Sequence, residues 1–148
     1  MELPDFNVLV ALCDPAHVHH EPAHAWFADA ARSEWATCPL TENGFLRVLS
    51  NPNYPDLRLS VSEAAARLRT IQVNHAGSYQ FWPDDLTLCD AAAFDLNAAH
   101  GPRQLTDIYL LGLCQRRDAT LVTFDRGIQA MTGAIIDARP DLLRLLVR

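Results

Sequence analysis

Residues 101–127 constrain the fold of this chain more than any other stretch, because they read as one helix followed directly by one buried strand. Thr106 is a suitable N-cap and places Asp107 in the first helical turn, where the helix dipole favours negative charge. The residues that follow are apolar on nearly every face, which is typical of a helix that covers a sheet. Residues 119–124 are apolar and partly β-branched, a pattern that indicates a buried strand. Asp125 comes at its end, so two carboxylates flank a helix–strand unit that can hold a cation.

Two further carboxylates occupy comparable positions earlier in the chain. A short apolar strand is expected to end near Asp5, with Asn7 in a bend before a helix that includes residues 8–12. Thr41 is expected to cap a second helix, whose first turn contains Glu42. Taken alone, Glu42 reads as an ordinary first-turn acid, since the helix dipole favours one there. Because it repeats the arrangement at the start of the later helix, it becomes a candidate for the same site.

Apolar periodicity and capping signals predict the remaining elements, and their alternation predicts the fold class. The expected helices begin near Pro22, at Thr41, after the Ser60–Glu63 capping box and after Asp84–Asp85; the expected strands are residues 35–40, 79–82 and 134–136; residues 140–148 form a leucine-rich helical tail. Helices that alternate with short apolar strands favour an α/β fold, here a single domain over residues 1–148 with a short, mostly parallel central sheet flanked by helices. Ligands of such sheets bind outside the carboxyl ends of the strands.

Composition narrows the class of protein further. The 148 residues are 49% hydrophobic and 20% charged, which fits one globular domain with a real core. No apolar run approaches the ~18 residues of a membrane-spanning helix, and the N-terminus lacks the pattern of a signal peptide. Four scattered cysteines without a Cys-x-x-Cys pair indicate buried free thiols in a reducing compartment. We therefore expect a cytoplasmic protein without membrane attachment.

The acidic residues point to a metal-dependent reaction. A formal net charge of −6 argues against a broad electrostatic grip on nucleic acid, but divalent cations held by carboxylates would themselves attract phosphate. Asp5, Glu42, Asp107 and Asp125 all fall at strand ends or at helix starts that follow strands, where they would repel one another without a cation. Oxygen ligands alone favour Mg²⁺ or Mn²⁺ over zinc. Such ions polarise a phosphodiester and lower the pKa of an attacking water.

A histidine-rich segment offers an alternative metal site. His20 and His24 are four residues apart and could share one helix face, as a pair of zinc ligands does. Because no thiolate or third imidazole has a matching spacing, we interpret this segment as the polar, solvated start of a helix.

Four motifs taken together resemble a known family. They read Leu-Pro-Asp-Phe-Asn-Val-Leu at 3–9, Thr-Glu-Asn-Gly-Phe-Leu-Arg at 41–47, Leu-Thr-Asp-Ile-Tyr-Leu at 105–110 and Val-Thr-Phe-Asp-Arg-Gly at 122–127. In order and context they are similar to those of PIN-domain ribonucleases, specifically the toxins of bacterial VapBC-type toxin–antitoxin pairs, over nearly the whole chain. Pro4 and the Ile-Tyr pair after Asp107 stand where small residues are frequent in the family, which bears on local packing. No acidic position is missing.

The resemblance implies an activity and a set of site residues. The acidic residues of the four motifs would bind Mg²⁺ or Mn²⁺ and cut RNA: Asp5, Glu42, Asp107 and Asp125. Asn7 and Thr123 occupy flanking motif positions and would orient ligands or water. The resemblance also implies a homodimer, an RNA substrate and a cognate antitoxin protein whose tail enters the acidic groove.

Other interpretations and contacts follow from the same residues. Arg47, Arg103 and Arg126 lie next to the acidic motifs and could contact RNA phosphates, although arginines near helix ends are often simply solvated. A non-catalytic PIN-like interaction module is one alternative, and it predicts an incomplete set of carboxylates. An aspartyl phosphotransferase of the haloacid-dehalogenase type is another, but it requires a second acid where this chain has Asn7.

Overall fold

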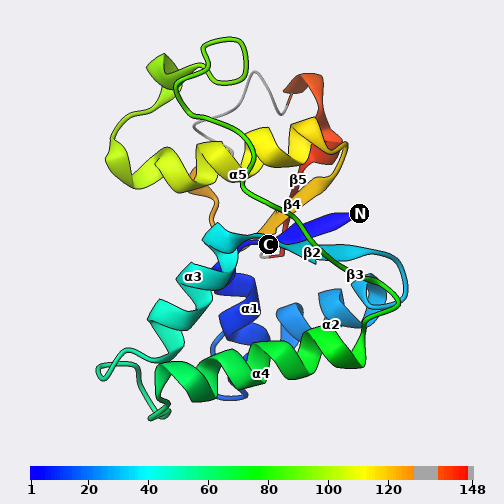
Figure 1. Ribbon diagram of the computed structural model, residues 1–148, viewed down its shortest axis with the longest axis vertical. Coiled ribbons are helices and arrows are strands. Elements are labelled where there is room, and N and C mark those ends of the chain that lie inside the picture. The colour runs from blue at the N-terminus through cyan, green and yellow to red at the C-terminus, as the bar shows by residue number, and fades with distance from the viewer. Residues whose placement is uncertain (129–136, 147–148) are drawn as a thin grey trace.

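The computed structural model describes residues 1–128 and 137–146, which form an α/β fold around a parallel sheet (Figure 1). The strand order is β3-β2-β1-β4-β5, and every neighbouring pair in it is parallel. The strands are short: β1 (Glu2–Pro4), β2 (Trp35–Thr37), β3 (Tyr79–Phe81), β4 (Thr120–Thr123) and β5 (Leu143–Leu145). The predicted fold class, a short parallel sheet flanked by helices, is confirmed.

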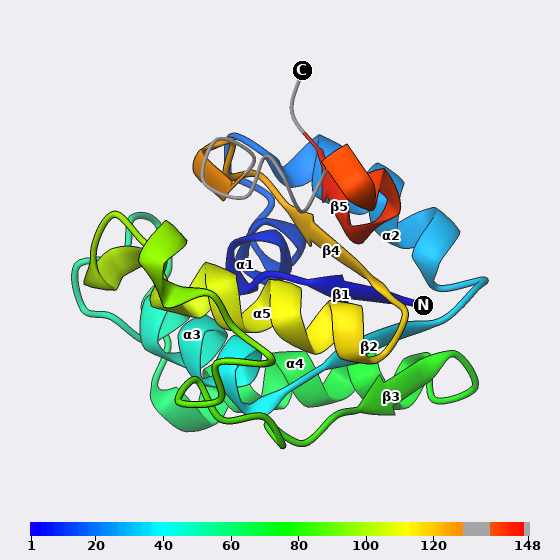
Figure 2. The same cartoon turned by 90° about the horizontal axis from the view of Figure 1, so that it is seen from above.

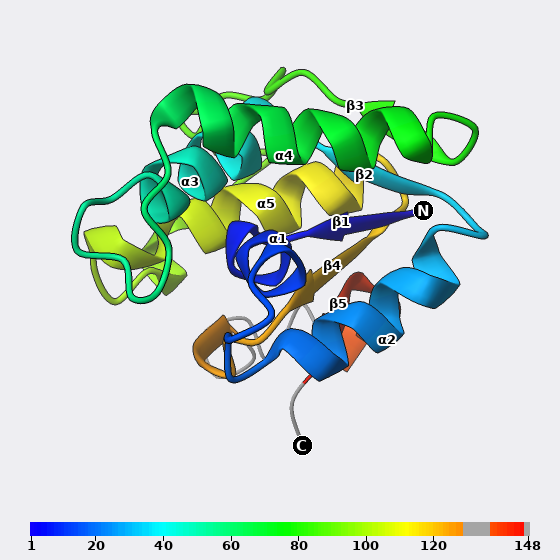
Figure 3. The ribbon, with the colours of Figure 1, turned by 90° about the horizontal axis from the view of Figure 1, so that it is seen from below.

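Helices cover both faces of this sheet. The α-helices are α1 (Phe6–Cys13), α2 (His20–Ala30), α3 (Pro39–Leu49), α4 (Val61–Asn74) and α5 (Leu105–Arg116), and the 3-10 turns are η1 (Leu96–Ala98), η2 (Pro102–Gln104) and η3 (Pro140–Leu142). In Figure 1, α5 and the segment before it lie on one side of the sheet, and α1 to α4 lie on the other. Figure 2, seen from above, shows α5 lying in front of the sheet, and Figure 3, seen from below, shows α1 between α2 and the α3–α4 pair.

The hydrophobic core consists of two clusters, one on each face of the sheet, because successive side chains of a strand point to opposite faces. Ala36 and Leu121 are fully buried in the cluster that contains the apolar side chains of α5. Their neighbours Trp35 and Val122 are fully buried in the other cluster, with side chains of α1 and α2. Successive residues of a strand point to opposite faces, so a strand buried on both faces reads as a continuous apolar run. This is why the strand at residues 119–124 could be recognised in the sequence.

Pro4 lies within the central strand β1. It is buried and pairs with Val122 of β4. The Glu2 amide donates to the Glu34 carbonyl on the β2 side, whereas the Asp5 amide donates to the Val122 carbonyl on the β4 side. By alternation the Pro4 nitrogen faces β2, where the β1–β2 pairing has already ended at Glu2 and Trp35. The missing N–H of proline therefore leaves no ladder bond broken.

Three helix starts differ from the predictions by a few residues. Cys38, not Thr41, is the N-cap of α3; the Thr41 hydroxyl lies at the third helical position and accepts from the Cys38 amide at 3.0 Å. Helix α5 begins at Leu105 rather than after a Thr106 cap, because the η2 turn runs straight into it. Asn7 lies in the first turn of α1, not in a bend. The first-turn positions of Glu42 and Asp107 are confirmed.

The predicted helix after Asp84–Asp85 is wrong, since residues 83–101 form turns and the short η1. Asp90 Oδ1 accepts from the Ala92 amide and Asp95 Oδ1 from the Asn97 amide. These local side-chain bonds give the backbone an alternative to the helical ladder.

The predicted helical tail is also wrong. Residues 140–145 form η3 and then β5, whose strand pairs with β4 from Leu121 to Thr123. The Leu146 amide donates to the Thr123 carbonyl, and Leu142 is fully buried. The exposed edge of β4 and the apolar face beneath it outweigh the helical propensity of the leucines. The strand predicted at residues 134–136 lies outside the described residues.

The cysteines and the helix lengths bear on two further expectations. All four cysteines are free, and Cys38 and Cys114 are buried as predicted, whereas Cys13 is half-buried and Cys89 is exposed. Burial raises the pKa of the Cys38 thiol to about 11. In the part of the chain that the structure describes, no helix is both long enough and apolar enough to cross a membrane.

Candidate metal centre

Asp5 stands at the carboxyl end of β1 and caps α1. Its Oδ1 accepts from the Phe6 amide at 2.6 Å, and its Oδ2 accepts from the Thr123 hydroxyl at 3.3 Å. The side chain of Asn7 also donates to it. Only 2% of Asp5 is exposed, and burial raises its pKa to about 6, although all three hydrogen bonds act in the opposite direction. The carboxyl group is therefore held in place but is costly to ionise.

Asp125 follows β4 and is linked to Asp5 through one hydroxyl group. The Thr123 hydroxyl that donates to Asp5 accepts from the Asp125 amide at 3.1 Å. Asp125 Oδ1 in turn accepts from the Gly127 amide at 2.7 Å, which fixes its side chain in a tight turn. Asp125 itself is exposed. Thr123 thus couples a buried carboxylate to an accessible one at the same end of the sheet.

Asp107 in the first turn of α5 completes this group of aspartates. It is half-buried, and its pKa is raised to about 7, first by burial and then by the negative charges of Asp5 and Asp125. The charge of Asp125 also raises the pKa of Asp5. The three carboxylates therefore lie close enough to repel one another, and no basic side chain is among the groups that shift either pKa.

Glu42 in α3 has hydrogen-bond partners of its own. Its Oε1 accepts from the Thr37 hydroxyl at 2.7 Å, from Gln72 Nε2 at 2.9 Å and, more weakly, from the Tyr79 hydroxyl at 3.5 Å. Gln72 also donates to the Tyr79 hydroxyl at 3.0 Å. Among the described residues, Oε2 of Glu42 has no hydrogen-bond partner, and Glu42 is not among the charges that raise the pKa of Asp5.

Residues Thr37, Gln72 and Tyr79, here called the Glu42 clamp, escaped the reasoning from sequence. Thr37 ends β2 and so had a detectable signal, because it stands at the carboxyl end of a strand just before Glu42. Gln72 and Tyr79 lie in α4 and β3, and nothing in their local sequence connects them with residue 42.

The donor chemistry of the aspartates suits a hard divalent cation. The aspartates and the Thr123 hydroxyl present carboxyl and hydroxyl oxygens, which are ligands of Mg²⁺ and Mn²⁺. Carboxylates that repel one another favour a bound cation, which supplies positive charge that offsets their repulsion. In this conformation no three Asp, Glu, His or Cys side chains among residues 1–128 and 137–146 lie close enough to enclose an ion.

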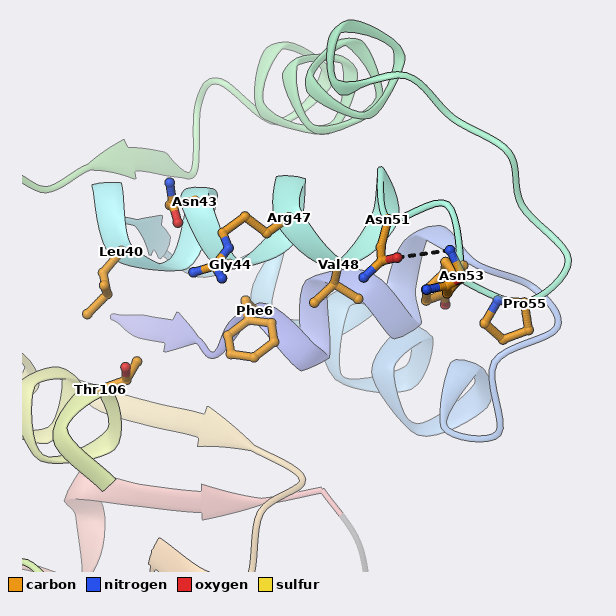
Figure 4. Close-up of a pocket in the computed structure, with 11 residues that line it drawn as sticks. Phe6, Leu40, Asn43, Gly44, Arg47, Val48, Asn51, Asn53, Pro55 and Thr106 are labelled. Atoms are coloured by element: carbon orange, nitrogen blue, oxygen red, sulfur yellow. Dashed lines mark hydrogen bonds between the residues drawn. The ribbon is translucent and has the colours of Figure 1, made fainter. Parts of the chain in front are cut away.

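The arginines named from the sequence occupy different settings. Arg47 of α3 lines a groove next to Phe6 and Gly44 (Figure 4). Arg103 is exposed in η2, just before α5, and Arg126 is exposed directly after Asp125. All three border the elements that carry the carboxylates, and Arg47 faces a hollow of the described surface.

The paired histidines at the start of α2 have a structural contact. The rings of His20 and His24 lie 5.3 Å apart between centroids, and His20 Nδ1 lies 2.8 Å from the Ala11 carbonyl oxygen. That contact ties α2 to α1. In the described residues no third ligand joins the pair.

Comparison with known proteins identifies the family that this fold and these carboxylates define. The model of the PIN domain family matches residues 3–134, and the chain belongs to that family. The membership that the four sequence motifs suggested is confirmed.

This chain matches curated relatives over nearly the full length of each relative. Ribonuclease VapC38 of Mycobacterium tuberculosis is 43% identical over 146 residues, which is 99% of this chain and 100% of the relative. Ribonuclease VapC44 of the same species is 41% identical over 134 residues, 89% of this chain and 92% of the relative. Ribonuclease VapC39 is 38% identical over 132 residues, 89% and 94% of the two chains.

Proposed function

We propose that this protein is a metal-dependent endoribonuclease that hydrolyses RNA phosphodiester bonds as the toxin of a toxin–antitoxin pair. The observation that carries the proposal is the group of three mutually repelling aspartates, Asp5, Asp107 and Asp125, at one end of a parallel sheet. Membership of the PIN domain family and relatives named as ribonucleases support the same reaction.

In this proposal Asp5, Asp107 and Asp125 would hold Mg²⁺ or Mn²⁺, and Glu42 would contribute its Oε2 from the edge of the site. When bound, the cation polarises the phosphodiester and lowers the pKa of an attacking water. Thr123 fixes the Asp5 carboxyl group through its hydroxyl, and Asn7 adds a second side-chain donor. The Glu42 clamp occupies Oε1 and thereby orients the other oxygen. Arg103 and Arg126 would contact RNA phosphates.

The proposal extends to the protein partners of this chain. The protein would act in the cytoplasm as a homodimer and would be inhibited by a cognate antitoxin. The leucine-rich tail cannot supply the dimer interface as a helix, because it forms β5 and buries Leu142 in the protein's own core. Exposed apolar side chains remain elsewhere: Val61 on α4 is 60% exposed, and Phe81 on the edge strand β3 is 53% exposed.

The test is cleavage of single-stranded and structured RNA by the purified protein. Cleavage should require Mg²⁺ or Mn²⁺, stop in EDTA and resume when the metal is restored. Asp125→Asn should abolish it, whereas Asp29→Asn, at an exposed aspartate of α2, should leave it unchanged. Undiminished cleavage in EDTA would refute the metal-dependent mechanism. No cleavage under any metal condition would favour the non-catalytic interaction module.

A further inference from the structure

A groove of about 560 Å³ opens directly beside the candidate metal centre. It lies between α3, the loop that follows α3, the start of α1 and the start of α5 (Figure 4). Phe6, which contributes its ring, follows Asp5 in the chain, and Thr106 on the opposite wall precedes Asp107. The groove is therefore lined by the chain neighbours of two of the three aspartates.

The walls of the groove carry the groups that recognise a nucleotide. The side chains of Asn43 and Asn51 offer both amide donors and carbonyl acceptors, and Arg47 brings a guanidinium group. Asn51 Oδ1 already accepts from the Asn53 amide at 2.9 Å, which leaves the NH₂ group of Asn51 as a donor. None of the described lining residues is acidic. In a chain with net charge −6, this is a path beside the carboxylates that does not repel a phosphate.

The aromatic wall is set by the packing of α1 against α3. Gly44 faces Phe6 so closely that a Cβ atom on Gly44 would lie 2.7 Å from Cγ of the ring. Any larger residue at position 44 would therefore force the Phe6 ring to shift. Gly44 therefore fixes the position of a half-buried aromatic ring beside the amides, and aromatic rings are surfaces on which RNA bases stack.

We propose that this groove binds one nucleotide of single-stranded RNA next to the phosphate that is cleaved, and so sets the sequence preference of the enzyme. The base packs against the ring of Phe6, while the side-chain amides of Asn43 and Asn51 form hydrogen bonds with its polar edge. Arg47 contacts the adjacent phosphate. The inference rests on the proposed ribonuclease function, since the bound nucleotide must continue into the aspartate site.

The first experiment maps the cut sites in a randomised single-stranded RNA pool for the parent and for the Asn43→Ala and Asn51→Ala variants. The parent should prefer one base at a fixed position beside the cut. The variants should lose that preference, with kcat/KM for the preferred sequence reduced roughly tenfold, as for the loss of base-edge hydrogen bonds. Asn74→Ala, at an exposed asparagine at the end of α4, is the matched control and should keep the parent's preference.

The second experiment separates this proposal from the ribonuclease function. Binding of a fluorescent single-stranded RNA to the protein in EDTA, measured by anisotropy, should weaken roughly tenfold in Arg47→Ala and in Gly44→Ala, with circular dichroism confirming that both variants fold. If the parent cleaves RNA but all groove variants keep its preference and affinity, the nucleotide site is wrong and the ribonuclease stands. If the parent neither binds nor cleaves RNA, both proposals fall. Loss of antitoxin binding with unchanged RNA binding would assign the groove to a protein partner and overturn the proposal.

Discussion

The aspartate group and the Glu42 clamp differ in how they surround a carboxyl group: the first by burial and negative charge, the second by hydrogen-bond donors. Burial and neighbouring negative charges raise the pKa of Asp5 to about 6 and that of Asp107 to about 7. Glu42 instead receives three hydrogen bonds on a single oxygen, from a hydroxyl, an amide and a phenol. One region stores unfavourable electrostatic energy that a cation would relieve, and the other fixes a carboxylate before a cation arrives.

The difference indicates that the four acids proposed for the site need not have one role. A ligand in the aspartate group should dominate both metal affinity and the stability of the metal-free protein, because its charge is poorly compensated there. A residue of the Glu42 clamp should act through the orientation of Glu42 and should therefore have a smaller effect. The following three predictions test this division.

The largest expected effect is that of Asp107→Asn on cleavage. The substitution keeps the shape of the side chain but removes one charged ligand, so kcat/KM should fall by at least about a hundredfold. In EDTA the variant should nevertheless unfold at a higher temperature than the parent, because one of three repelling charges is gone. Added Mg²⁺ should stabilise the parent more than the variant. Lower stability in EDTA together with an undiminished response to Mg²⁺ would make Asp107 an ordinary helix-start residue.

An intermediate effect is expected from Gln72→Leu in the Glu42 clamp. The substitution removes the Nε2 donor to Glu42 but leaves every aspartate in place. Affinity for Mg²⁺, measured by calorimetry, should fall about tenfold, as for loss of a group that orients a ligand. Gln115→Leu, at an exposed glutamine of α5, is the matched control. An equal loss of Mg²⁺ affinity in Gln72→Leu and Asp107→Asn would contradict the proposed difference between the two regions. An unchanged Mg²⁺ affinity in Gln72→Leu would show that Glu42 is not part of the site.

The smallest effect is the pH dependence of the metal-free protein's stability. Both raised pKa values mean that the folded protein holds more protons than the unfolded chain between about pH 4 and pH 7. The free energy of unfolding in EDTA should therefore fall as pH rises through this window. Because Asp107 is half-buried and partly screened by solvent, we expect it to contribute about 1–2 kcal/mol to this fall in the free energy of unfolding. Urea titrations of the parent and Asp107→Asn at pH 5 and pH 8 test this: equal slopes with pH in the two proteins would contradict it.

Local sequence patterns were enough to predict most of the elements and the positions of the acids along them. Strand β4, the capping box of Ser60 and Glu63, and the first-turn places of Glu42 and Asp107 are local features, in which neighbouring residues supply the signal. Apolar periodicity and cap chemistry act within a few residues, and for that reason they can be recognised without any knowledge of the fold. The metal-ligating role of the four acids and the extent of the domain over residues 1–148 stay predictions.

The groups that meet in space are set by the tertiary fold. Pro4 fits the central strand because pairing with β2 has ended there, and the tail becomes β5 because β4 offers an open edge. Glu42 is joined by Gln72 and Tyr79 through hydrogen bonds between residues 30 and 37 positions apart. Such contacts depend on burial and on the geometry of distant elements, which no local pattern encodes. The same reason explains how three aspartates from separate motifs come to share one electrostatic environment while the fourth acid is held in another.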